Sequence, residues 1–440
     1  MLLEFRMSNY KSFKDKTAFS LIPAPKQKGL DYSVLREAIG KKEYKGLCSA
    51  VIYGPNASGK TNIIGAMDTF KAIVLRGNIR NDEDKSAPNA ASSTLELIPN
   101  NTSDIASPVT FAIKFIADSV LIDYRIALNL GTFLAVDCKR NIMSEQLAVN
   151  ELPIFTRTDR LVIHKLGGIK KWLANEFEQN AESAIAIASA NLDAEELFLT
   201  NGFKAMFSAK LVSLITEWLN SKFMIIYRAD AMQLIPKFND PKKKSVYVER
   251  TLTEAAEPFG INSNALGYVV DGDNAEAKLF SVFELGEKRK AIPAELFESY
   301  GTIRFINMFP LVVNALMNGG TLVVDEFDAS IHPMALMNIV NIFHNDNVNI
   351  HHAQLIFNTH NPIFLNANLF RRDEIKFVER DEQTHCSSSY ALSDFGTAGA
   401  NGVRKNEDYM HNYFIDRYGA IRDVDFLPVF EKLLGYESEA

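Results

Sequence analysis

The residues best suited to chemistry lie in the run Gly54-Pro55-Asn56-Ala57-Ser58-Gly59-Lys60-Thr61, which follows an apolar stretch at 50–53. This run has the spacing G-x-x-x-x-G-K-[ST] of a phosphate-binding loop. Its glycines let backbone N–H groups face phosphate oxygens, and the helix that should follow adds a partial positive charge. The alternative is a glycine-rich turn without a ligand.

We expect this loop to bind a nucleotide. Lys60 should reach the β- and γ-phosphates and act in catalysis, and the Thr61 hydroxyl should bind Mg²⁺. The predicted nucleotide contacts are Gly54, Pro55, Asn56, Ala57, Ser58, Gly59, Lys60, Thr61 and Asn62.

A second chemical group is the acid pair Asp325-Glu326, which ends the apolar run 319–324. A buried parallel strand delivers such acids to the sheet edge where ligands bind in doubly wound folds. We expect Asp325 to hold Mg²⁺ and Glu326 to orient and deprotonate an attacking water. Acids are also common at strand ends without a function, and it is the upstream loop that favours a catalytic role.

His360 follows another predicted strand, at 353–358, about thirty residues beyond the acids. A histidine at a strand end is often structural. Its position after a neighbouring strand favours instead a donor that points at the γ-phosphate. We therefore include His360 among the predicted catalytic residues.

Ser299 and Gly301 stand at the head of a predicted apolar helix. Capping of that helix by Ser299 is one interpretation, and it is the one that the segment alone favours. The other is a second helix N-terminus that binds phosphate.

The elements that must position these groups alternate between strands and helices, which predicts an α/β fold of more than one lobe. Strands are predicted within 1–22, at 109–115 and 121–128, and across 142–157, and 23–46 reads as a polar connection. Residues 158–265 show helical spacing and predict an inserted helical arm. The predicted domains are 1–157 and 266–440, which form one head, and the arm at 158–265.

Composition narrows the class of protein. The chain of 440 residues has a net charge of −7 and three cysteines without metal-binding spacing. We expect a cytoplasmic protein, because no apolar run approaches membrane-spanning length and no secretory signal is visible. Three basic runs leave open contact with nucleic acid, although a lysine triplet is usually a solvated turn. They are Lys170-Lys171, Lys242-Lys243-Lys244 and Lys288-Arg289-Lys290.

Taken together, these motifs resemble the ABC-type ATPases of the RecF/SMC/OLD clan. The resemblance rests on Asn9-Tyr10-Lys11-Ser12-Phe13, the loop 54–61, a signature-like Ser299-Tyr300-Gly301-Thr302, the Walker B segment 322–326, the D-loop Ala329-Ser330-Ile331-His332-Pro333 and His360 as switch histidine. More narrowly, the chain resembles prokaryotic ATPases of the RloA/AbiL type, associated with abortive infection and phage defence. That likeness rests on Ser144-Glu145-Gln146-Leu147, Phe155-Thr156-Arg157, Glu298 before the signature, Thr359-His360-Asn361-Pro362, Arg404-Lys405 and Arg417-Tyr418-Gly419-Ala420.

The resemblance implies an ABC-type P-loop head, with a mixed sheet, flanking helices and an antiparallel β subdomain, plus the arm. It implies that Ser299 and Gly301 of one subunit cover the ATP and Mg²⁺ held by another. The signature departs from the Ser-Gly-Gly-Gln of transporters and SMC proteins, and Gln146 is a candidate for the Q-loop.

Our leading hypothesis is an ATPase, a homodimer or higher oligomer with ATP between its subunits, that acts as a switch and controls a separate effector, a nuclease or toxin, in phage defence. No acidic nuclease constellation follows residue 380, so the effector should be another polypeptide. The alternative is a RecF/SMC-like repair ATPase that clamps DNA on ATP binding. A scaffold that holds ATP without hydrolysing it is a third class, which the set Lys60, Asp325, Glu326 and His360 disfavours.

Overall fold

The structure, a computed structural model, describes all residues of the chain except 26, 28, 82–94, 103, 136–137, 165, 174–180, 228–245, 249–262, 264, 271–276, 399–401, 406, 423 and 435–440. Within the described residues it has a mixed α/β architecture with several sheets. This agrees with the predicted α/β class and with a P-loop NTPase domain.

The core of the molecule is a sheet with the strand order β11-β16-β17-β5-β18-β19, of which all neighbours except β18 and β19 pair in parallel. Its described strands are β5 (Ser49–Tyr53), β11 (Phe223–Ile226), β16 (Thr321–Val324), β17 (Gln354–Asn358), β18 (Ile375–Arg380) and β19 (Ser387–Ala391). Every residue of β5, β16 and β17 is buried. This explains why they read as continuous apolar runs rather than alternating ones.

Helices cover both faces of this sheet. They are α1 (Lys60–Arg76) on one face, and α6 (Tyr300–Asn318) and α7 (Pro333–Phe343) on the other. Side chains alternate along β5, so that Ala50 and Ile52 join the apolar cluster around α1, whereas Val51 and Tyr53 join the cluster around α6 and α7. The strand that leads into the phosphate-binding loop is therefore fixed from two sides.

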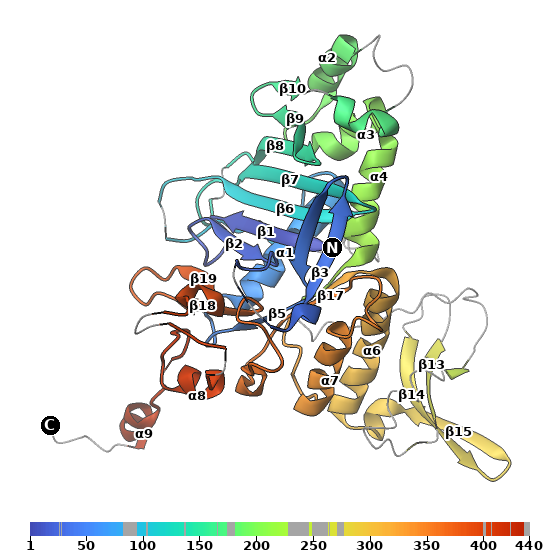
Figure 1. Ribbon diagram of the computed structural model, residues 1–440, viewed down its shortest axis with the longest axis vertical. Helices are drawn as coiled ribbons and strands as arrows, with labels where there is room; N and C mark the ends of the chain where they lie inside the picture. Colours follow the sequence, from blue (N-terminus) through green and yellow to red (C-terminus); the bar gives the residue numbers. More distant parts are fainter. Residues whose placement is uncertain are drawn as a thin grey trace.

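A larger antiparallel sheet lies beside the core sheet (Figure 1), with the strand order β10-β9-β8-β7-β6-β1-β2. Its strands are β1 (Leu2–Ser8), β2 (Thr17–Ser20), β6 (Val109–Ala117), β7 (Val120–Asn129), β8 (Asn141–Val149), β9 (Leu152–Arg157) and β10 (Leu161–Ile163). Phe5 and Phe111 of this sheet pack against Phe70 of α1, and Phe115 stacks on Trp218 at a ring distance of 3.9 Å. The strands predicted within 1–22 and at 109–157 are confirmed.

Gln354 connects the two sheets. This buried residue of β17 accepts a hydrogen bond from the backbone N–H of Leu2 in β1 (2.5 Å) and donates to the carbonyls of Leu2 (2.9 Å) and Leu47 (2.8 Å). Its side-chain oxygen also accepts from the Thr321 hydroxyl of β16 (3.0 Å). One amide thus satisfies backbone groups that the apolar interface would otherwise leave unpaired.

Two predicted segments differ in the structure. The connection 23–46 contains the hairpin of β3 (Val34–Ile39) and β4 (Lys42–Leu47), which a polar composition did not reveal. The inserted helical arm is not confirmed as a separate body, because Phe203, Leu211 and Trp218 belong to the same apolar cluster as α1. Directly after them, β11 pairs in parallel with β16 of the core sheet. The boundaries 157/158 and 265/266 remain predictions.

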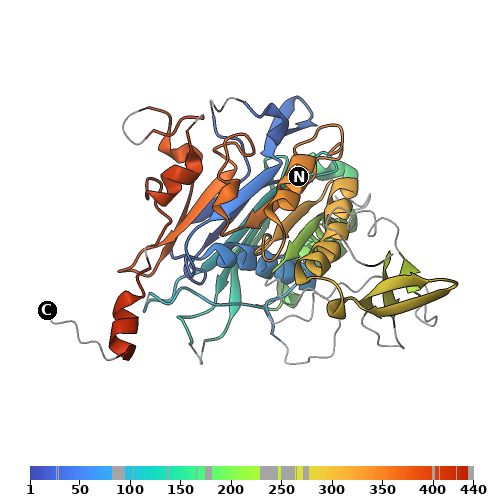
Figure 2. The same ribbon diagram turned by 90° about the horizontal axis from the view of Figure 1, so that it is seen from below.

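The described helical elements of this region are η3 (Leu166–Trp172), α2 (Ala181–Asn191), η5 (Leu199–Phe203), α3 (Lys204–Met206), α4 (Ala209–Glu217) and η6 (Trp218–Lys222). Elsewhere the described helices are η1 (Asp31–Ser33), η9 (Ala294–Leu296), η10 (Pro362–Phe364), η11 (Leu392–Phe395), α8 (Tyr409–Phe414) and α9 (Leu427–Leu434). A small antiparallel sheet is formed by β12 (Val246–Val248), β13 (Ala265–Val270), β14 (Ala277–Leu285) and β15 (Lys288–Pro293). It projects from the end of the molecule opposite α9 (Figures 1 and 2).

Candidate functional site

The phosphate-binding loop leaves the carboxyl end of β5 at Gly54 and enters α1 at Lys60. Gly59 has φ +112°, and a side chain there would meet the hydroxyls of Ser12 and Ser387 within 2.8 Å. At Gly54 a Cβ would lie 2.2 Å from the carbonyl oxygen of Val378. Only glycine fits these two positions, because the backbone is both left-handed and closely packed there.

Lys60 bends back over the loop. Its Nζ donates to the carbonyls of Gly54 (2.7 Å) and Pro55 (3.0 Å). Burial lowers the pKa of Lys60 to about 8, against the opposing influence of Asp325 and Glu326. The ammonium group of Lys60 therefore donates its hydrogen bonds to two backbone carbonyl oxygens. Phosphate oxygens of a bound nucleotide would be stronger acceptors for the same group.

The acid pair lies directly across from the start of α1. The Thr61 hydroxyl donates to Oδ1 of Asp325 (3.1 Å), and the Asn358 amide donates to the same oxygen (2.5 Å). Asn358 also accepts from the backbone N–H of Glu326. A hydroxyl and a carboxylate at this separation are the hard oxygen ligands that Mg²⁺ prefers, so the residues present fit a Mg²⁺ site.

Glu326 and His360 line one cavity of about 340 Å³ together with the phosphate-binding loop. Partial desolvation and the nearby Lys60 lower the pKa of His360, which is exposed on the cavity side, so its ring is neutral near pH 7. The described residues that line this cavity are Ser12, Asn56, Ala57, Ser58, Gly59, Lys60, Thr61, Asn62, Glu326, Asn358, His360 and Arg380. The structure thus brings Lys60, Thr61, Glu326 and His360 around a single space, and the buried Asp325 joins them through its hydrogen bond with Thr61.

Three residues of this cavity were not among the predicted site residues. Asn358 and Arg380 are the last residues of β17 and β18, and Ser12 lies in the turn after β1. Asn358 could have been found, because it ends a predicted strand two residues before His360. No local pattern marks Arg380, which reaches the site because its strand pairs in parallel with β5. Ser12 belongs to the motif at 9–13, but only its packing on Gly59 shows that it lies at the nucleotide cavity.

Ser299 and Gly301 do not line this cavity in the single chain. Ser299 is exposed and caps α6, accepting a hydrogen bond from the backbone N–H of Thr302 at 3.1 Å. The capping interpretation therefore describes its place within one subunit. A role toward the nucleotide of another subunit stays a prediction.

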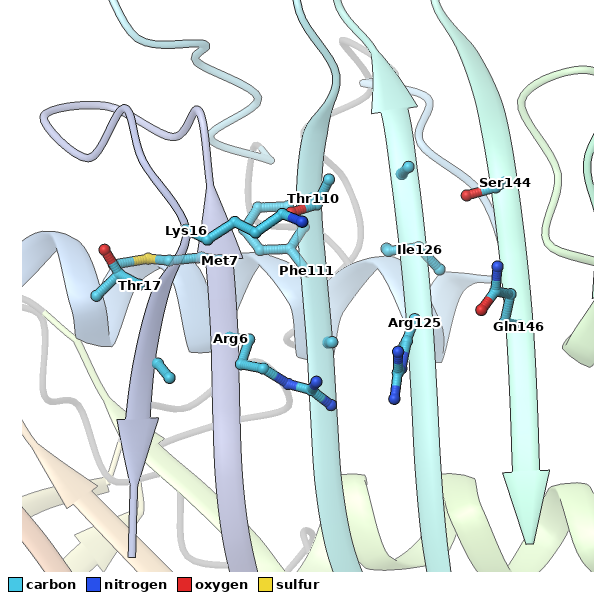
Figure 3. Close-up of a pocket in the computed structure, with 13 residues that line it drawn as sticks. Arg6, Met7, Lys16, Thr17, Thr110, Phe111, Arg125, Ile126, Ser144 and Gln146 are labelled. Carbon is cyan, nitrogen blue, oxygen red and sulfur yellow. The ribbon is translucent and has the colours of Figure 1, made fainter. Parts of the chain in front are cut away.

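Gln146, the Q-loop candidate, lies on β8 away from the nucleotide cavity. It lines a separate open cavity on the antiparallel sheet with Arg6, Lys16 and Arg125 (Figure 3). Arg6 and Arg125 both form ion pairs with Asp123 on this face. Gln146 consequently does not take part in the nucleotide site. The lysine triplet 242–244, a candidate for nucleic-acid contact, lies outside the described residues.

Comparison with known families agrees with this geometry. Residues 49–366, well over half of the chain, match the family model described as "AAA domain, putative AbiEii toxin, Type IV TA system". The chain belongs to this AAA domain family. No curated protein matches the chain.

Membership of this AAA domain family makes the chain a member of a P-loop ATPase family, and it supports nucleotide binding at the loop described above. Among the helices that the structure describes, none is both long and apolar enough to cross a bilayer.

A polar cluster lies at the opposite, amino-terminal end of the core strands, and its central residue Glu374 follows the matched residues. There the Glu374 carboxylate accepts hydrogen bonds from Ser49 (2.6 Å) and the backbone N–H of Arg371 (2.8 Å), and lies 3.2 Å from His344. Burial raises the pKa of the neighbouring Cys48, which keeps its thiol protonated. We assign these groups to packing, because hydrogen bonds already satisfy the carboxylate.

Proposed function

We propose that this protein is an ABC-type ATPase that binds and hydrolyses ATP and dimerises on ATP as a molecular switch. Controlling a separate effector in bacterial anti-phage defence is the role that we assign to the switch. The observation that carries the enzymatic part is that Lys60, Glu326 and His360 line one cavity beside the phosphate-binding loop, while Asp325 accepts a hydrogen bond from Thr61 of that loop.

Each residue has a distinct task in the proposed reaction. Lys60 and the loop N–H groups bind the β- and γ-phosphates. Thr61 and Asp325 would hold Mg²⁺, which would neutralise charge on the phosphates. Glu326 accepts a proton from water as that water attacks the γ-phosphorus, and the bond to the β–γ bridging oxygen breaks to give ADP and phosphate. His360 in its neutral form donates a hydrogen bond to the γ-phosphate.

The exposure of the α6 N-terminus supports the proposed dimer. Ser299, Tyr300 and Leu296 at this end of α6 are exposed, and none of them lines the nucleotide cavity of its own chain. An ATP held by one subunit and contacted by Ser299 and Gly301 of a second would favour the dimer by binding both at once. Hydrolysis would remove the γ-phosphate contacts and loosen the pair, and a separately encoded nuclease or toxin would sense the change.

The decisive experiment uses Glu326→Gln, with Glu382→Gln on an exposed loop as the matched control. We expect Glu326→Gln to bind ATP with wild-type affinity but to release phosphate at least about a hundredfold more slowly. Light scattering should show an ATP-dependent dimer that persists in this variant, and a pull-down with the product of the adjacent gene should depend on ATP. Equal phosphate release by both variants would refute the assignment of Glu326.

DNA clamping is the competing proposal. The described basic runs are exposed but lie on different elements, Lys170-Lys171 on η3 and Lys288-Arg289-Lys290 on β15, and the net charge is −7. Tight, ATP-stimulated DNA binding with a steep salt dependence would favour this alternative over the effector switch.

A further inference from the structure

Arg304 is a buried cation in the second turn of α6, with a relative exposure of 7%. Its Nη2 donates to the backbone carbonyl of Glu326 at 2.6 Å. Its Nε is also buried and has no hydrogen-bond partner among the described residues. A buried guanidinium with incomplete hydrogen bonding lowers the stability of the folded protein. We therefore expect the contact between Arg304 and Glu326 to serve the function of the site.

The backbone of Glu326 is held in an unusual conformation. Its φ is +51°, in the left-handed region that a residue with a side chain seldom adopts. Two groups fix the adjoining peptides, because Asn358 accepts from the N–H of Glu326 and Arg304 donates to its carbonyl. The direction of the Glu326 carboxylate depends on this backbone conformation, since side chains follow the Cα–Cβ bond.

The first turn of α6 also contacts the segment 326–330, which begins at Glu326. A Cβ on Gly301 would lie 2.1 Å from the carbonyl oxygen of Ser330. The backbone of Ser330 has φ +63°. Ser299 caps this turn, one turn before Arg304. The first two turns of α6 are therefore packed against segment 326–330 without room for independent movement.

We propose that Arg304 is a positioning residue, which holds the Glu326 carboxylate in its catalytic orientation and connects it to the turn that carries Ser299. This inference rests on the proposed function. A triphosphate of a second subunit that contacts Ser299 would shift α6 and, through Arg304, the Glu326 of the same chain. The two nucleotide sites of the dimer would then control each other's hydrolysis.

The test compares Arg304→Ala and Arg304→Lys with Asn307→Ala, which removes a partly buried polar side chain one turn later on α6. Asn307 contacts Tyr268 and not the segment 326–330. We expect Arg304→Ala to lower kcat by about tenfold or more with KM changed less than about threefold, because a displaced catalytic group costs rate rather than binding. Arg304→Lys should recover part of kcat, and Asn307→Ala should hydrolyse ATP like the wild type.

A double variant tests the connection to Ser299. If Ser299 and Arg304 act as one unit, Ser299→Ala together with Arg304→Ala should lose about as much kcat as the more damaged single variant, instead of the product of the two losses. Multiplicative losses, or a kcat of Arg304→Ala within about twofold of Asn307→Ala, would overturn the inference. Parallel losses of Tm and ATP affinity in Arg304→Ala and Arg304→Lys would also overturn the inference, since such losses indicate a structural role only. A wild-type protein without ATPase activity would instead refute the proposed function itself.

Discussion

At the scale of single residues, Lys60 connects burial with ligand affinity. The lysine is charged near neutral pH, but burial has brought its pKa down to about 8, and carbonyl oxygens are its acceptors. A bound triphosphate would add strong negative charge at the same place and raise the pKa of Lys60 again. Binding of ATP therefore favours the protonated lysine.

This linkage predicts a pH-dependent affinity. Above pH 8 the free protein loses the Lys60 proton, and ATP binding must take it up, so we expect Kd to increase toward tenfold per pH unit between about pH 8 and pH 9.5. Titration with a fluorescent ATP analogue from pH 7 upward measures this. Lys60→Met should bind more weakly and show no such slope, and a Kd that stays constant in the wild type would contradict the assigned pKa shift.

At the scale of elements, the close contact of α6 with the acidic segment can be tested without touching a charged group. Gly301→Ala places a methyl group where the Ser330 carbonyl now lies. We expect a destabilisation of about 1–3 kcal/mol and slower ATP hydrolysis, because α6 must move away from segment 326–330. Thermal unfolding and phosphate release measure the two effects.

Gly167→Ala is the matched control for that substitution, since a Cβ at Gly167 meets no atom within 4 Å. Its Tm and its hydrolysis rate should equal those of the wild type. If Gly301→Ala behaves in the same way, α6 has more freedom at this contact than its packing indicates.

The elements also show what a sequence can predict here. The phosphate-binding loop and the strand at 321–324 carry their own local patterns, and both were predicted at their observed places. β11 was missed because Phe223–Ile226 continues a helically spaced apolar run, and only its parallel pairing with β16, about a hundred residues later, makes it a strand. Arg304 was missed for a related reason, since its acceptor is a backbone carbonyl that no side-chain pattern reveals.

At the scale of the whole molecule, Gln354 joins the antiparallel sheet to the core sheet. Gln354→Ala would leave a buried N–H of Leu2 and the carbonyls of Leu2 and Leu47 without this partner. We expect a loss of about 2–4 kcal/mol in the free energy of unfolding, measured by denaturant titration. Gln146→Ala, on the open face of the antiparallel sheet, should change stability by less than about 0.5 kcal/mol.

The side-chain amide of Gln354 also determines how the protein unfolds. From its place on β17, its side chain forms hydrogen bonds with β1, β4 and β16 at once, so neither sheet can separate from the other without losing hydrogen bonds. Heating should accordingly produce one calorimetric peak, with the slowest-exchanging amides of β1 and β17 released together. A ligand bound at the carboxyl ends of the core strands would then stabilise the distant antiparallel sheet as well. The two sheets would unfold in one transition, with or without the ligand.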